Sequence, residues 1–173
     1  DPFAMLPFCG YNMGDYFSHW LKVGERQGAQ LPKIFFVNWF RKDQDGKFIW
    51  PGFGDNARVL KWVSDRLDGT AEARETAIGL VPAKGALDTS GLTISDEAMH
   101  TLTDVDLDVW GEEADLIPAH YEKFGDRLPQ RLWDEYAALI ERLGEARSGK
   151  PMKAAAARAT AAPRQVSDRP TAS

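Results

Sequence analysis

A nearly continuous run of apolar, β-branched and aromatic residues, "LPKIFFVNWF" at positions 31–40, limits the possible folds of this chain more than any other segment. Pro32 stands near its start, and the charged segment "RKDQDGK" follows it. A short apolar run between turn signals is typical of a strand that is covered on both faces, as in the sheets of α/β proteins. We therefore predict a buried strand over 31–40, a short return segment at "KFIWP", and a mixed α/β fold.

Helical periodicity recurs in three parts of the chain, 11–24, 57–68 and 95–144. The apolar face of the first helix consists of Tyr16, Phe17, Trp20 and Leu21, before Gly24. The apolar stripe of the second consists of Val59, Leu60, Val63 and Leu67, before Gly69. The third part predicts a short helix in "SDEAMHTLTD", a longer one over Leu107 to Phe124, and a last one from Pro129 to Gly144.

The ends of the second helix and the segment after it are less regular. Asp55 or Asn56 is placed to cap its N-terminus, directly after the glycines of "PGFGDN". Residues 70–92 carry Gly, Pro and the short apolar run "IGLVP". We expect an irregular segment there with one short strand at most.

Composition excludes several classes of function. The chain has 173 residues, 43% of them hydrophobic, which suits one packed domain. A formal charge of −5 and a pI near 5.2 argue against binding to nucleic acid or to a membrane surface, because both need a positive field. The sequence contains no apolar stretch of membrane-spanning length, and its single cysteine, Cys9, cannot form an internal disulfide. These features predict a cytoplasmic protein.

The composition changes after Gly149. The segment "KPMKAAAARATAAPRQVSDRPTAS" has five basic residues against one Asp and few bulky apolar residues. Such a segment buries too little surface to offset its ordering entropy. We predict a folded part over 1–149 and a disordered basic tail over 150–173. The chain begins "DPFAM" without an initiator Met, and we expect it to be a piece of a longer protein.

Local motifs for phosphate and metal binding are absent from the sequence. No G-x-x-x-x-G-K-[ST] occurs, so no loop of that kind cradles a triphosphate. His19, His100 and His120 are far apart and form no pair at metal-ligand spacing. We therefore predict no metal ligands and no catalytic residues within this segment.

The stretch "FVNWFRKDQDGKFIWPGFGDN" (36–56) is the remaining candidate for chemistry. Gly52 and Gly54 flank Phe53 and permit close approach of a planar ligand, and Asn56 lies near a helix start. A carboxamide offers both a donor and an acceptor, as a guanine edge requires. Stacking on an aromatic ring contributes roughly 1–3 kcal/mol per base. The pattern permits a purine-base pocket, with burial of the same aromatic residues in the core as the alternative.

Two segments together resemble a known family. "DPFAMLPFCGYNMGDYFSHWL" and "LPKIFFVNWFRKDQDGKFIWPGFGDNARVLKWV", with the spacing between them, closely resemble the C-terminal part of GTP-dependent phosphoenolpyruvate carboxykinase. The resemblance is strong over residues 1–69 and looser over 70–144. Leu6 and Cys9 replace an Arg and a Phe that many animal members carry, which points to a bacterial branch.

The resemblance implies that the fold is the C-terminal part of a larger nucleotide-binding domain. It implies an enzyme that converts oxaloacetate and GTP to phosphoenolpyruvate, GDP and carbon dioxide in gluconeogenesis, with Mn²⁺ and with Mg²⁺ on the nucleotide. In the family three phenylalanines grip the guanine ring, followed by a GTP-contacting segment. The corresponding residues here are Phe40, Phe48, Phe53, Gly54, Asp55 and Asn56. The third position of the GTP-contacting segment, Asp55, is often Glu in the family.

The resemblance also assigns the phosphate loop and the metal ligands to the upstream part of the same enzyme, which becomes the partner of this segment in a monomer. We therefore expect the 173-residue chain alone to be inactive. Two alternatives stay open: a separate fragment with weak binding of guanine nucleotides or proteins, and a remnant whose aromatic residues only pack.

Overall fold

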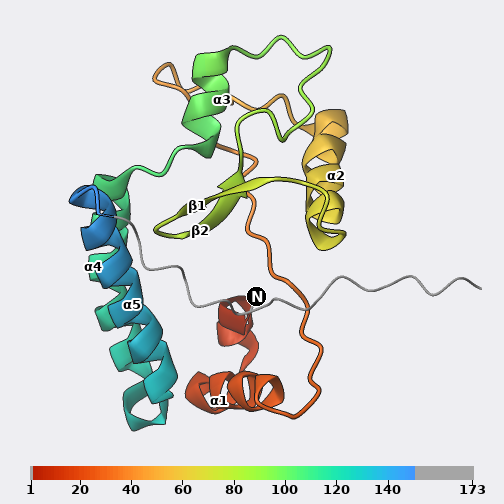
Figure 1. Ribbon diagram of the computed structural model, residues 1–173. Coiled ribbons are helices and arrows are strands. Elements are labelled where there is room, and N and C mark those ends of the chain that lie inside the picture. The colour runs from red at the N-terminus through yellow and green to blue at the C-terminus, as the bar shows by residue number, and fades with distance from the viewer. Residues whose placement is uncertain (1, 151–173) are drawn as a thin grey trace, which may run out of the picture. The chain divides into compact units, whose positions relative to one another are not determined.

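The computed structural model describes residues 2–150 (Figure 1). It divides into two compact units, and we describe each by itself. The first unit comprises residues 2–36, 76–78 and 104–150, and the second comprises residues 37–75 and 79–103. The tail predicted over 150–173 lies, beyond Lys150, outside the described residues. Within the described part, no helix is both long enough and apolar enough to cross a membrane.

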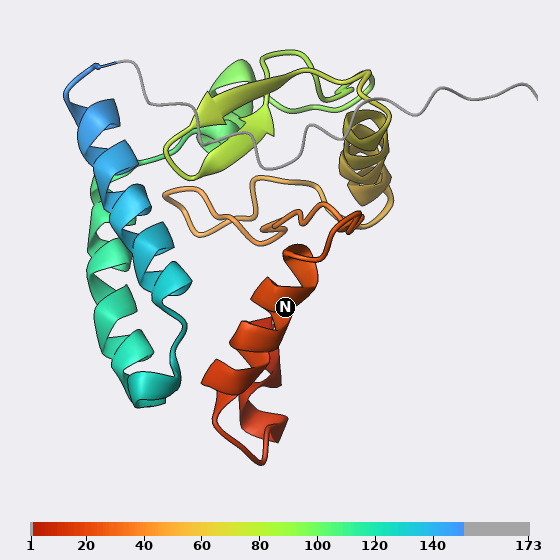
Figure 2. The same ribbon diagram turned by 60° about the horizontal axis from the view of Figure 1, so that its bottom comes forward.

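The first unit is helical. Its elements are η1 (Pro2–Phe8), α1 (Met13–Gly24), α4 (Leu107–Tyr121), η3 (Glu122–Arg127) and α5 (Gln130–Arg147). Helices α4 and α5 lie side by side and are joined through η3 (Figures 1 and 2). The helices predicted over 11–24, from Leu107 and after Pro129 are confirmed, although α5 continues past Gly144 to Arg147.

A buried cluster joins α1 to η3 and the start of the next segment. Its members are Met13, Phe17, Phe124 and Leu128. The rings of Phe17 and Phe124 meet edge to face, with centroids 5.3 Å apart. The Asn12 side chain forms hydrogen bonds with both α1 and η3. Its Oδ1 accepts from Gly14 N–H at 2.8 Å, and its Nδ2 donates to the Phe124 carbonyl at 3.0 Å. One side chain therefore caps α1 and ties it to η3.

A second cluster lies between α4 and α5. It consists of Ala77, Ala114 and Leu143, which are almost completely buried. Arg142 on α5 donates through Nε to the Ala77 carbonyl at 2.8 Å. Small side chains at 77 and 114 let the backbones come close, so the three-residue segment 76–78 belongs to the helical unit.

The second unit holds the remaining elements. They are η2 (Phe53–Asp55), α2 (Asn56–Leu67), the hairpin strands β1 (Ala73–Thr76) and β2 (Gly79–Pro82), and α3 (Asp96–Thr103). The hairpin is a two-stranded sheet, where we expected one short strand at most. The last residue of β1, Thr76, groups with the first unit. Helices α2 and α3 match the sequence prediction.

The buried residue of helix α2 is not one of the four in the predicted stripe, of which Val59 and Val63 are half-buried. Trp62 is buried, and its indole Nε1 donates to the Glu72 carbonyl at 3.2 Å. Leu60 and Leu67 of the predicted stripe are 59% and 53% exposed. A periodic stripe shows which face can be covered, whereas burial also needs a neighbouring surface. In the described residues, the neighbouring segment covers Trp62 and leaves these leucines exposed.

The prediction of a buried strand over 31–40 is wrong for this chain. Residues 31–38 have no regular structure, and Leu31, Ile34 and Phe36 are 57%, 78% and 93% exposed. A strand needs a neighbour for its N–H and C=O groups. Within residues 2–150 the only sheet is the hairpin, whose two strands pair with each other. The observed α and β content is therefore mostly helix with one small hairpin.

Candidate functional site

A tight turn organises the first half of the candidate segment, within the second unit. Lys42 and Phe48 form an isolated antiparallel bridge. Asp43 N–H donates to the Lys47 carbonyl at 2.9 Å, and Ile49 N–H donates to the Arg41 carbonyl at 3.0 Å. The return segment predicted at "KFIWP" is thus present, but as a single bridge rather than a strand.

One carboxylate holds this turn closed. Asp43 Oδ1 accepts from the backbone N–H groups of Asp45 at 3.0 Å and Lys47 at 2.9 Å. An Asp side chain that binds backbone groups just ahead of it stabilises a turn in place of a regular ladder. Gly46 has φ of 79°, a conformation that favours glycine.

The turn brings two of the predicted phenylalanines together. The ring centroids of Phe40 and Phe48 are 5.9 Å apart, with planes at 62°. Asn38 Oδ1 accepts from Phe40 N–H at 2.9 Å and fixes the backbone on entry. Phe40 is 70% exposed and Phe48 58% exposed, so this pair is not core. Lys42 Nζ lies 5.2 Å from the centroid of Phe48, within range of a cation–π contact.

Phe53, the third predicted phenylalanine, stands apart from this pair. Its side chain is 99% exposed, and its φ is 43°. Positive φ is uncommon for a residue with a β-carbon and costs of order 1 kcal/mol or more. Gly52, with φ of 79° and ψ of −168°, precedes it and sets the direction of the turn. The backbone conformation here places the Phe53 ring in solvent and not in the core.

Asn56 is the first residue of α2, and its side chain is bound to Trp50. The Trp50 indole Nε1 donates to Asn56 Oδ1 at 2.9 Å, and Trp50 is only 5% exposed. Asn56 is therefore not a side-chain cap for the helix. Gly54 is exposed, and its position has open space where a β-carbon would lie.

Asp55 occupies the N-cap position of α2, but its side chain makes no capping hydrogen bond. Its Oδ1 instead accepts from Arg58 Nε at 3.0 Å. Arg58 also donates through Nη1 to the Asp88 carbonyl at 3.0 Å. Hydrogen bonds from Ser90 hold the pKa of the Asp88 carboxyl below its usual value. Arg58 therefore connects the start of α2 to the loop at 88.

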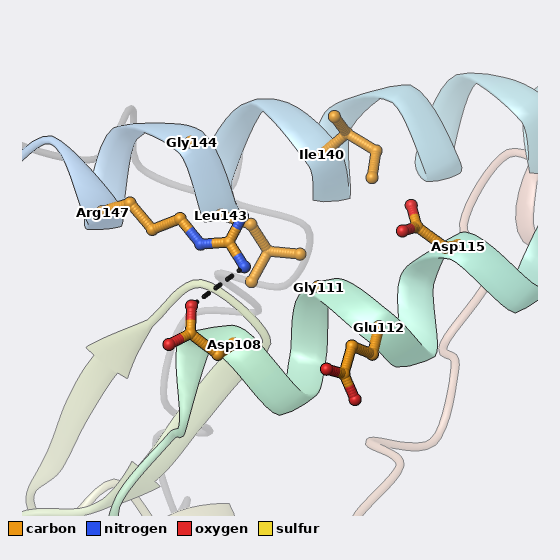
Figure 3. Close-up of a pocket in the computed structure, with 8 residues that line it drawn as sticks. All are labelled: Asp108, Gly111, Glu112, Asp115, Ile140, Leu143, Gly144 and Arg147. Atoms are coloured by element: carbon orange, nitrogen blue, oxygen red, sulfur yellow. Dashed lines mark hydrogen bonds and ion pairs between the residues drawn. The ribbon is translucent and has the colours of Figure 1, made fainter.

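A separate groove of about 590 Å³ lies in the helical unit, between α4 and α5 (Figure 3). It is lined by Asp108, Gly111, Glu112, Asp115, Ile140, Leu143, Gly144 and Arg147. Arg147 Nη2 donates to the Leu107 carbonyl at 2.7 Å and lies 3.5 Å from Asp108 Oδ1. The absence of a side chain at Gly111 leaves room for this guanidinium. Three carboxylates against one arginine make the groove unsuited to a triphosphate.

No group of three or more His, Cys, Asp or Glu side chains within residues 2–150 is placed to hold a metal ion. The side chain of Asp108 on α4 is 95% exposed. The described residues therefore offer exposed aromatic rings at 40, 48 and 53 and no fitted metal site.

Comparison with known proteins identifies the family of the chain. Residues 1–142, which include the whole candidate segment, match the family model of the phosphoenolpyruvate carboxykinase C-terminal P-loop domain. The chain belongs to the GTP-dependent phosphoenolpyruvate carboxykinase family. The family resemblance drawn from its two aromatic segments is confirmed.

Several carboxykinases of this family are close relatives in sequence. The phosphoenolpyruvate carboxykinase [GTP] of Treponema pallidum (strain Nichols) is 57% identical over 145 residues, which cover 83% of this chain and 24% of that protein. Those of Neocallimastix frontalis and Renibacterium salmoninarum are each 53% identical, again over 83% of this chain and 24% of the relative. The chain thus spans about a quarter of the length of these carboxykinases.

Two residues without a role predicted from the sequence lie beside the predicted site. Trp50 holds the carboxamide of Asn56, and Lys42 lies against the ring of Phe48. The spacing of six residues between a Trp and an Asn carries no recognised signal. The spacing of Lys42 and Phe48 across a predicted turn is the only hint that the sequence offers for the second contact.

Proposed function

We propose that residues 36–56 recognise the guanine base of GTP in a phosphoenolpyruvate carboxykinase that converts oxaloacetate to phosphoenolpyruvate and carbon dioxide. The observation that carries the proposal is the exposed pair of rings, Phe40 and Phe48, held 5.9 Å apart by a hydrogen-bonded turn. Exposed aromatic rings held by a structured turn are suited to stacking on a planar ligand, because burying their faces against a base removes apolar surface from water.

The third ring, Phe53, is a further exposed aromatic side chain, and its backbone conformation is strained. Phe53 keeps positive φ and nearly full exposure. Strained backbone that displays a side chain is found at ligand-binding positions, where the ligand supplies the missing contact. Gly54 beside it has open space around its α-carbon, which suits close approach of a base to the backbone.

The rest of the reaction requires groups that this segment does not supply. In the proposed enzyme Mn²⁺ and the Mg²⁺ of the nucleotide are held by residues outside the segment, as the family resemblance implies. The upstream part of the same polypeptide supplies the phosphate cradle. The segment's contribution is to position GTP for in-line transfer of its γ-phosphoryl group. A cytoplasmic, monomeric enzyme remains our expectation.

The experiment that tests the proposal compares two substitutions in the complete enzyme that carries this segment. Phe48→Ala removes one ring of the pair, and Leu60→Ala removes an apolar side chain of equal exposure on α2. We expect Phe48→Ala to lower kcat/KM for GTP by about tenfold, the equivalent of one lost stacking contact. We expect Leu60→Ala to leave it unchanged. Equal values for Phe48→Ala and the parent enzyme would overturn the proposal.

A further inference from the structure

The hydrogen bond between Trp50 and Asn56 fixes the orientation of the Asn56 carboxamide. An indole N–H can only donate, so the atom that it reaches at 2.9 Å is the carboxamide oxygen. Trp50 is 5% exposed, so its ring has little freedom to follow a rotating partner. The amide nitrogen of Asn56 then points away from Trp50, and it donates no hydrogen bond to any of the described residues.

We propose that Trp50 is a positioning residue for base selectivity: it fixes the Asn56 carboxamide so that its Nδ2 donor is presented to the oxygen on C6 of the bound purine. This inference rests on the proposed function. Asn56 is only half-buried at the start of α2, three residues after Phe53, so its outer end is accessible to a ligand of that surface.

The group that a purine carries at C6 makes this orientation selective. Guanine and hypoxanthine carry a carbonyl oxygen at C6, which accepts from the Asn56 amide. Adenine carries an amine at the same place, which sets a donor against a donor. A donor that loses its partner on binding costs more than a simple missing contact, because both groups were solvated beforehand.

Removing the indole N–H frees the carboxamide. Once Oδ1 of Asn56 is no longer held, the amide can turn by half a revolution and offer its oxygen to the amine of adenine. Loss of the Trp50 donor therefore relaxes the preference for guanine and hypoxanthine over adenine. It does not abolish nucleotide binding, because the stacking rings stay in place.

The second unit provides a matched control. Trp62 on α2 is also buried, at 7% exposure, and its Nε1 donates to the backbone carbonyl of Glu72 at 3.2 Å. Replacing either Trp by Phe removes a buried indole N–H and leaves a similar gap. Only Trp50 is bonded to the proposed base-reading side chain.

The test measures kcat/KM for GTP, ITP and ATP in the complete enzyme that carries this segment. We expect Trp50→Phe to reduce the GTP/ATP and ITP/ATP ratios by about tenfold, the equivalent of one hydrogen bond to the base. We expect Trp62→Phe to keep both ratios while lowering thermal stability about as much as Trp50→Phe does. Asn56→Asp retains an acceptor for Trp50 and removes the donor, so it should reduce the same ratios without disturbing Trp50.

The outcomes separate this inference from the proposed function. Unchanged ratios in Trp50→Phe, with GTP use still impaired by Phe48→Ala, would overturn the inference alone, whatever the result for Asn56→Asp. An equal change of the ratios in Trp50→Phe and Trp62→Phe would also overturn it, since general loosening would then explain the effect. Unimpaired GTP use in Phe48→Ala would overturn the proposed function itself.

Discussion

Gly14 lies directly against the backbone of Arg127, 113 positions later in the chain. A β-carbon at residue 14 would collide with the Arg127 carbonyl oxygen and come within 2.6 Å of its carbonyl carbon. Backbone atoms cannot move aside as the end of a flexible side chain can. Only glycine therefore lets α1 approach η3 this closely, and the ion pair between Asp15 and Arg127 at 2.9 Å lies beside the same contact.

The first prediction is that Gly14→Ala destabilises the helical unit. Overpacking against main-chain atoms costs typically 1–3 kcal/mol and outweighs the helix propensity that Ala gains, so we expect a net loss of about 2 kcal/mol. Gly144→Ala is the matched control, because nothing lies within 4 Å of a β-carbon there on α5. It should stabilise the chain by up to about 1 kcal/mol. Urea unfolding monitored by circular dichroism measures both, and a stabilising Gly14→Ala would contradict the packing.

The second prediction concerns the turn below the ring pair. Asp43→Ala removes the acceptor for two backbone N–H groups and should lower kcat/KM for GTP about fivefold in the complete enzyme, because Phe48 loses its fixed position. Asp43→Asn keeps an acceptor oxygen and should restore most of the activity. If Asp43→Asn is as impaired as Asp43→Ala, the negative charge rather than the turn is responsible.

The third prediction separates stacking from base reading. Phe53→Ala should weaken use of GTP and ATP by similar factors, because both bases present the same kind of π-face. Asn56→Ala should weaken GTP more than ATP and narrow the preference, since a buried unpaired group costs about 1–3 kcal/mol. Steady-state kinetics with both nucleotides decide it. An unchanged GTP/ATP ratio in Asn56→Ala would assign the selectivity to backbone groups.

The fourth prediction is that the 173-residue chain self-associates through residues 31–36. Ile34 and Phe36 are 78% and 93% exposed, and their spacing of two would place them on one face of a strand if this segment paired with another chain. Exposed apolar side chains on a segment outside any sheet favour association with another chain. Sedimentation velocity at rising concentration should show association in the parent chain and loss of it in Ile34→Lys/Phe36→Lys. The Leu60→Lys chain, altered at an exposed apolar position of α2, should still associate.

The fifth prediction is that the purified 173-residue chain forms no phosphoenolpyruvate from oxaloacetate, GTP and Mn²⁺. The sequence has no G-x-x-x-x-G-K-[ST] loop to hold the phosphates. A coupled assay for phosphoenolpyruvate measures the outcome. Turnover that copurifies with the chain and disappears in Phe53→Ala would disprove it.

Local patterns predicted the helices of the chain well. The stripe of Phe17 with its neighbours located α1, and Pro129 located the start of α5. The sequences of the two aromatic segments also suffice to identify the family. Such signals are readable because a helix satisfies its own hydrogen bonds within a short stretch, so its residues carry most of the information about it.

Tertiary contacts decided which of these segments are buried. The apolar run at 31–40 has the composition of a covered strand, yet Ile34 is exposed because no strand of the described residues pairs with it. On α2, Trp62 is buried and its indole N–H donates to the carbonyl of Glu72, ten residues away, whereas Leu60 is exposed. A residue is buried only when a second surface covers it, and the sequence of one segment does not show which surface that will be.

The sequence by itself therefore determined the helices, the family and the candidate set that includes Phe40, Phe48 and Asn56. Only the tertiary structure decided that Phe40 and Phe48 meet while Phe53 is almost fully exposed, and that Trp50 donates to the Asn56 carboxamide. Helical periodicity and family motifs are local properties of the chain. The orientation of a side-chain amide depends on its hydrogen-bond partner, which the intervening turn places beside it. No local sequence pattern predicts this contact.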